Sequence, residues 1–263
     1  MRFEFVETAT SRIEVMLHGR SGPLVFMHPE AFGGIRGDTP FAEALVALGA
    51  RFVGMNPRGS GGSMGPMTEI TLHDMAADAI AVIERYGDGP VVIIGHAGGN
   101  RVGRMVATLR PELVRVLILV CAGGRVPPSP EVSAATARWR DDSLPWAERL
   151  AGAEVAFLAP GNHFPDYFPW PDYSFAAATA WGAAGRATNT DEWWAGGTGR
   201  IFVVQGAQDP AAPPQNGHLL RDEFPDRVEL VDIEGAGHFP QIEQPQATLA
   251  AVAGFLRREG LLG

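Results

Sequence analysis

The hydrophobic pattern of the chain begins with alternation and then changes to short, wholly apolar runs. Residues 2–8 and 11–18 alternate apolar and polar positions, which predicts a pair of half-buried strands. Further apolar runs, typical of strands buried on both faces, lie at 23–28, 51–56, 90–95, 114–120, 200–206 and 227–233. Together these segments predict a sheet of about eight strands.

Helical patterns lie between the apolar runs. Over residues 72–86 the apolar side chains recur on one helical face, and Thr71 with Asp74 forms a capping-box sequence at the start. A second amphipathic pattern covers residues 243–258. Because strands and helices alternate, we expect an α/β fold with a doubly wound, mostly parallel sheet.

One segment breaks this alternation. Residues 125–195 are rich in proline and glycine and hold much of the aromatic content of the chain. We expect them to form a helical cap on a core domain made of residues 1–124 and 196–263. The aromatic side chains of the cap either pack against the core domain or line an apolar pocket, and Trp181 is a candidate for the pocket wall.

The composition narrows the class of protein. A chain of 263 residues with 46% hydrophobic and 19% charged residues can bury a full core. The net charge of −9 and the lack of a basic run argue against nucleic acid as a partner. No window reaches the ~18–20 apolar residues of a membrane span, and the N-terminus does not resemble a signal peptide. The single cysteine, Cys121, fits a reducing compartment. We therefore expect a cytoplasmic monomer or homodimer that acts on a small molecule.

Three segments place potential catalytic groups at the ends of predicted strands. "GHAGG" (95–99) has the glycine frame of a nucleophile elbow, with Ala97 where the nucleophile normally stands. "VVQGAQDPAAPP" puts Asp209 in the turn after one strand, and "IEGAGHFPQIEQP" puts His238 in a Gly-rich loop after the next. Each residue alone is more typical of an ordinary turn or loop. The order elbow, acid, histidine is that of a hydrolase triad.

This order resembles the α/β-hydrolase family over essentially the whole chain. "FMHPEAFGG" (26–34) resembles the oxyanion loop of the family, and "NPRGSGGS" (56–63) resembles its Asp-x-Arg-Gly-x-Gly turn, with Asn56 in place of Asp. "GHAGGNRVGRMVATLRPEL" is similar to a branch whose elbow reads Gly-His-Ala-x-Gly-Asn. The resemblance implies the α/β-hydrolase fold and an enzyme that needs no cofactor.

The resemblance also assigns roles at the site. Ala97 takes the nucleophile position, Asp209 the acid and His238 the base. The backbone N–H of Gly98 would be one oxyanion donor. Pro29 has no N–H, so a second donor would come from Glu30 or Ala31.

Four other residues near these motifs are candidates for the site. Glu30 stands in the loop that normally faces the nucleophile, although an exposed loop residue is the commoner case. Cys121 ends the strand beside the elbow strand, so its thiol is an alternative nucleophile, with a small buried residue as the commoner role. His28 and His96 are candidates for binding substrate. The histidines show no metal-ligand spacing, so we expect no metal site.

Three functional classes are compatible with these residues. The first is hydrolysis of a small apolar or aromatic ester, lactone or C–C bond, with His238 activating water directly. The second is lyase or isomerase chemistry in which His238 or Glu30 abstracts a proton. The third is a receptor that binds a ligand without turnover. An engineered replacement of serine by alanine would leave the same sequence. The retained Asp209 and His238 favour the hydrolase.

Overall fold

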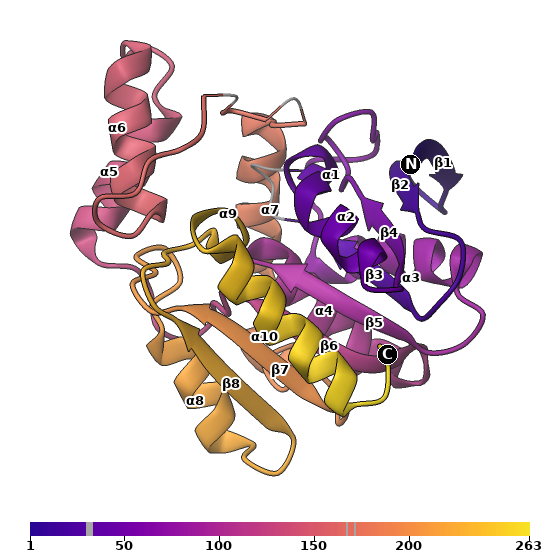
Figure 1. Cartoon of the computed structure of the whole chain (residues 1–263). Coiled ribbons are helices and arrows are strands. Elements are labelled where there is room, and N and C mark those ends of the chain that lie inside the picture. Colours follow the sequence, from indigo (N-terminus) through magenta and orange to yellow (C-terminus); the bar gives the residue numbers. More distant parts are fainter. Residues whose placement is uncertain (30–33, 167, 171) are drawn as a thin grey trace.

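The structure is a computed structural model that describes residues 1–29, 34–166, 168–170 and 172–263. One sheet organises it, with the helices packed on both faces (Figure 1). The strands are β1 (Arg2–Glu7), β2 (Arg12–His18), β3 (Leu24–His28), β4 (Arg51–Met55), β5 (Val91–His96), β6 (Val114–Val120), β7 (Ile201–Gly206) and β8 (Val228–Ile233). Every predicted strand is present, with bounds that differ by at most one residue from the prediction.

The strand order is β1-β2-β4-β3-β5-β6-β7-β8. β1 pairs antiparallel with β2, and β2 antiparallel with β4, whereas all other pairs are parallel. The carboxyl ends of β5, β6, β7 and β8 therefore meet at one edge of the sheet. The prediction of a doubly wound, mostly parallel α/β fold is confirmed, and this edge is where ligands bind in such sheets.

Two layers of helices cover the sheet. The helices are α1 (Gly34–Gly37), α2 (Thr39–Ala47), α3 (Leu72–Tyr86), α4 (Gly98–Leu109), η1 (Pro111–Leu113), α5 (Pro130–Arg140), α6 (Trp146–Phe157), α7 (Phe175–Ala187), η2 (Thr190–Glu192), α8 (Gln215–Glu223), α9 (Pro240–Glu243) and α10 (Pro245–Arg258). The helix predicted at 72–86 has these bounds and carries its capping box. None of the described helices is long and apolar enough to cross a bilayer.

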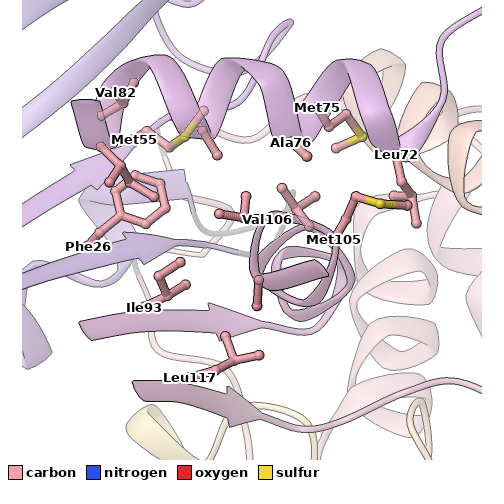
Figure 2. Close-up of a cluster of buried hydrophobic side chains, with 14 of the residues drawn as sticks. Phe26, Met55, Leu72, Met75, Ala76, Val82, Ile93, Met105, Val106 and Leu117 are labelled. Carbon is pink, nitrogen blue, oxygen red and sulfur yellow. The ribbon is translucent and has the colours of Figure 1, made fainter. Parts of the chain in front are cut away.

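Each face of the sheet has its own hydrophobic core. On one face, α3 and α4 bury side chains such as Met75 and Val106 against Phe26, Ile93 and Leu117 of the strands (Figure 2). On the other face, α2 and α10 pack against the alternate residues of the same strands, and Phe202 stacks on Phe255 with ring centroids 4.5 Å apart. Strands buried on both faces explain why their sequences are continuous apolar runs.

The segment between β6 and β7 carries α5, α6 and α7. Figure 1 shows α5 and α6 projecting from the body of the molecule, whereas α7 lies against it. The described part of this segment has its own apolar cluster, which includes Trp139, Phe157, Phe168 and Trp170 together with Phe239 of the histidine loop. The sequence left open whether these aromatic side chains pack against the core domain or line a pocket, and many of them form the core of this segment.

Charged groups join this segment to the sheet domain. Arg36 pairs with Asp172 and, at 2.7 Å, with Glu14. Asn56 donates to Glu14 Oε2 at 2.8 Å and accepts from the backbone N–H of Ile35 at 2.9 Å. An aspartate at position 56 would bring a second carboxylate against Glu14, so this network accounts for the departure from the family's turn sequence.

Candidate active site

Ala97 occupies a strained turn between β5 and α4. Its backbone has φ 50° and ψ −113°, a conformation that costs an alanine roughly 1–3 kcal/mol. The frame glycines allow close approach, since an added Cβ would lie 2.5 Å from the Cα of Asn100 at Gly95 and 2.1 Å from the His28 carbonyl oxygen at Gly99. The chain therefore retains the backbone of a nucleophile elbow although position 97 has no reactive group.

His238 and Asp209 form a buried hydrogen-bonded pair. The Nδ1 of His238 lies 3.0 and 2.9 Å from the two carboxylate oxygens of Asp209. The carboxylate also accepts from the N–H groups of Ala211 and Ala212, at 2.9 and 2.8 Å, and from the Gln205 amide at 3.3 Å. Because the Asp209 oxygens accept from the surrounding N–H donors, we assign the proton to Nδ1, which makes Nε2 the basic nitrogen.

The loop that carries His238 is held by the segment between β6 and β7. The His238 backbone N–H donates to the Phe157 carbonyl at 2.6 Å, where α6 ends. Glu243 of α9 accepts from the N–H groups of Gly237 and Phe239 on either side of the histidine, at 2.9 and 3.0 Å. Its other oxygen accepts from Ala159 N–H and from the Asn162 amide, both at 2.8 Å. The Glu243 carboxylate thus joins the histidine loop to the segment between β6 and β7.

A cavity of about 640 Å³ lies above the elbow. Ala97, Gly98 and His238 contribute to its wall from the sheet domain. The described aromatic side chains that line it are Phe157, Trp181 and Trp193. Its size suits a small molecule, and it brings the elbow, the base and the predicted Trp181 into one site.

His28 and His96 are not among the described residues that line the cavity. His28 is fully buried, and burial lowers its pKa to about 4. His96 donates from Nε2 to the His238 carbonyl at 2.7 Å, and Gln241 donates to its Nδ1 at 3.3 Å. Burial and the nearby His238 lower the pKa of His96 to about 3. Both side chains are therefore neutral, and the prediction that they bind substrate stays a prediction.

Cys121 follows β6 and lies beside the pair. Its Sγ, an Asp209 oxygen and a His238 nitrogen all lie within 4.8 Å of one another, so these three groups are the described candidates for a metal site. Burial and the Asp209 charge raise the pKa of the thiol well above its usual range. The thiol is therefore protonated, and Asp209 already accepts hydrogen bonds at both oxygens, so the cluster fits an acid–base pair better than a metal centre.

Two predicted residues, Glu30 and Ala31, lie outside the described residues. Sequence reasoning missed Arg101, Arg186 and Trp193, which also line the cavity. A signal for Arg101 was present, because it follows Ala97 by four residues and one helical turn separates positions on the same face. Gln241 and its partner Asp38 lie 203 residues apart in the chain, so no local pattern could have connected them.

Known proteins share the family and the fold of this chain. The sequence profile described as the alpha/beta hydrolase family matches residues 15–252. BpoC of Mycobacterium tuberculosis, named as a candidate non-heme bromoperoxidase, is 24% identical over 90% of this chain and 95% of its own length. The structure of Rv0554 from the same organism superposes with a TM-score of 0.83 at 22% identity, covering 97% and 99% of the two chains. A hydrolase from Pseudomonas aeruginosa gives 0.78 at 21% identity, covering 97% of this chain and 98% of its own. The profile match covers most of the chain.

Proposed function

This chain belongs to the α/β-hydrolase family, and we propose that it hydrolyses a small carbonyl compound with water in the role of the missing serine. The bond broken would be that of an ester, a lactone or an activated C–C bond. The observation that carries the proposal is the intact His238–Asp209 pair, with Nδ1–carboxylate distances of 2.9 and 3.0 Å, in the wall of a cavity that also contains Ala97. A protein that only binds a ligand has no need of an oriented base.

The mechanism uses His238 as a general base. Its Nε2 takes a proton from a water molecule above Ala97 while the water oxygen attacks the substrate carbonyl carbon. The oxyanion that forms would accept from the N–H of Gly98, the first residue of α4, where the helix leaves N–H groups without intrahelical partners. The C–O or C–C bond to the leaving group then breaks, and the imidazolium returns its proton to that group. Asp209 stabilises the imidazolium in between.

The rate expected for this mechanism follows from the absence of a nucleophilic side chain at position 97. In a serine protease, removing the nucleophile leaves roughly 10³–10⁴-fold catalysis over water from the remaining machinery. We propose that the segment 125–195 serves as the cap that shields this reaction. Its Phe157 carbonyl holds the His238 backbone, which supports a direct role of the cap in positioning the base.

The test compares the unaltered protein with Ala97→Ser and His238→Ala on activated esters such as 4-nitrophenyl acetate and on a panel of lactones. Ala97→Ser is expected to add or accelerate esterase activity, because the elbow already has the required backbone conformation. His238→Ala should abolish the turnover of both the unaltered protein and Ala97→Ser. Circular dichroism of each variant controls for folding.

Two results would contradict the mechanism. If Ala97→Ser gains nothing and no carbonyl substrate is turned over, the site is that of a ligand-binding protein. If activity survives His238→Ala but disappears in Glu30→Gln, a proton-transfer reaction based in the oxyanion loop replaces water activation.

A further inference from the structure

The described lining of the cavity contains three arginines and no acidic residue. Arg101 comes from α4, Arg140 from α5 and Arg186 from α7. The chain as a whole carries a net charge of −9, so this cationic lining is opposite in sign to the rest of the molecule. Arg140 and Arg186 are exposed, whereas Arg101 is partly buried. Positive charge thus extends from the exposed arginines of the cavity to the partly buried Arg101, which lies four residues after Ala97.

Arg101 has no partner among the described residues that would explain its position. Its Nε is buried and makes no hydrogen bond to the described residues, and no described acid forms an ion pair with the guanidinium. The guanidinium fits between two glycines, because an added Cβ would lie 2.8 Å from Nη1 at Gly185 and 3.6 Å from Nη2 at Gly123. The contact that it does make is with the ring of Trp193, 5.6 Å from the centroid.

Arg104, less than one turn further along α4, shows what a structural arginine looks like in the same helix. It is fully buried, and its guanidinium donates to the Asn100 side chain at 2.8 Å and to the carbonyls of Gly123 and Trp194 at 2.7 and 3.4 Å. Fixed acceptors therefore hold both terminal nitrogens of Arg104, although its Nε, like that of Arg101, has no acceptor among the described residues. Arg101 faces the cavity with no such acceptor in the described chain, although a buried guanidinium is costly when unpaired.

The tryptophans of the same wall share this feature. The indole N–H groups of Trp181 and Trp193 are buried and have no acceptor among the described residues. Burial and the charge of Arg186 lower the pKa of Arg101, as expected for a cation that lacks a counter-ion. The groups left without partners in this wall are all hydrogen-bond donors, so a ligand that completes them must supply acceptors and negative charge.

We propose that the substrate of this site is a small acid, whose carboxylate pairs with Arg101 while its carbonyl carbon lies above Ala97. The inference rests on the proposed hydrolase function for the reacting carbonyl. Ala97 and Arg101 line the same cavity of about 640 Å³, so one small molecule can reach both positions. Arg140 and Arg186 attract the acid toward the cavity, and Trp181 and Trp193 contact its apolar part.

Binding can be measured without turnover, by calorimetry with a matched pair of probes. 3-Benzoylpropionate carries an aromatic ring, a ketone and a carboxylate, and 3-benzoylpropionamide has the same shape without the charge. The unaltered protein should bind the acid at least ten-fold more tightly than the amide. Arg101→Gln should remove this preference, whereas Arg20→Gln, at an exposed loop position, should keep it.

The results separate this inference from the proposed function. Equal affinity for acid and amide, or a preference that survives in Arg101→Gln, overturns the carboxylate site whether or not the protein is a hydrolase. A carboxylate preference that depends on Arg101 supports the site even if His238→Ala shows that the hydrolase mechanism is wrong. If Arg101→Gln fails to fold, Arg101→Met and a salt titration of acid binding to the unaltered protein provide the same test, with salt-independent binding counting against the proposal.

Discussion

The two sides of the cavity differ in how their polar groups are satisfied. On the side of the loops after β7 and β8, Asp209 accepts from His238, Gln205 and two backbone N–H groups, so its acceptors are saturated by the protein. On the side of α4 and α7, the buried Nε of Arg101 and the buried indole N–H of Trp181 have no acceptor among the described residues. Groups that perform chemistry are held in place before the ligand binds, whereas groups that recognise a ligand lack hydrogen-bond partners until it binds. Under the proposed function, the saturated side would perform catalysis and the unsatisfied side would recognise the ligand.

The largest expected effect comes from disturbing the saturated side. Asp209→Asn would place an amide N–H₂ against His238 Nδ1 and force the ring proton onto Nε2, where it faces the cavity. The base would then be lost without removing any atom of the histidine. We expect turnover by the unaltered protein and by Ala97→Ser to fall roughly 10²–10⁴-fold.

The matched control for Asp209→Asn is Asp142→Asn, at an exposed position between α5 and α6. Rates with an activated ester, measured from pH 5 to 9, distinguish loss of the base from a shift in its titration. Full activity of Asp209→Asn at any pH in this range would mean that the saturated side does not perform the chemistry.

Asp38, which is not among the described residues that line the cavity, is a poorly satisfied acid, and it should make stability depend on pH. Asp38 is buried and accepts from Gln241 at 3.3 Å, and burial raises its pKa from 3.8 to about 7. The folded state therefore holds this proton more tightly than the unfolded state. Its contribution to stability is complete below about pH 4 and is lost as the pH rises through 7.

Asp38→Asn should remove this loss. We expect the free energy of unfolding of the unaltered protein to fall by roughly 2–4 kcal/mol more than that of Asp38→Asn between pH 4 and pH 8. Urea unfolding at several pH values measures the difference, with Asp142→Asn as the control. Parallel pH profiles for the unaltered protein and Asp38→Asn would show that Asp38 is ionised at little cost.

The sequence predicted the saturated side far better than the unsatisfied one. Buried strands are apolar runs, and the ends of parallel strands must meet at one edge, so positions 97, 209 and 238 could be brought together from order alone. The cavity lining contributed by the segment between β6 and β7 could not be predicted in this way. Which aromatic side chain faces the cavity depends on how α5, α6 and α7 pack. Trp139 lies in the apolar cluster of the segment between β6 and β7, whereas Trp193 lies in the cavity wall.

The link between the two sides can be weakened through Glu243. In Glu243→Gln the amide keeps one acceptor oxygen and turns N–H₂ toward two of the four donors that the carboxylate now accepts from. We expect a loss of about 2 kcal/mol in the free energy of unfolding, because donors are left unmatched. Since Gly237 and Phe239 flank His238, the rate should also fall, while acid binding at Arg101 stays within about two-fold. A change in acid binding as large as the change in rate would mean that the two sides form one unit.

The smallest expected effect concerns the exposed end of the unsatisfied side. Arg186 is exposed and has no ion pair within the described chain, so it should attract an acid without contributing much to the bound state. Arg186→Gln is expected to slow the association of 3-benzoylpropionate about two- to five-fold at low ionic strength, with little change in its dissociation rate. Because exposed charges are screened within about 10 Å at 0.1 M salt, the difference should largely disappear at high salt. Stopped-flow quenching of tryptophan fluorescence measures both rates, since Trp181 and Trp193 line the cavity. A change confined to the dissociation rate would place Arg186 in direct contact with the carboxylate and move the recognition site from Arg101 toward α7.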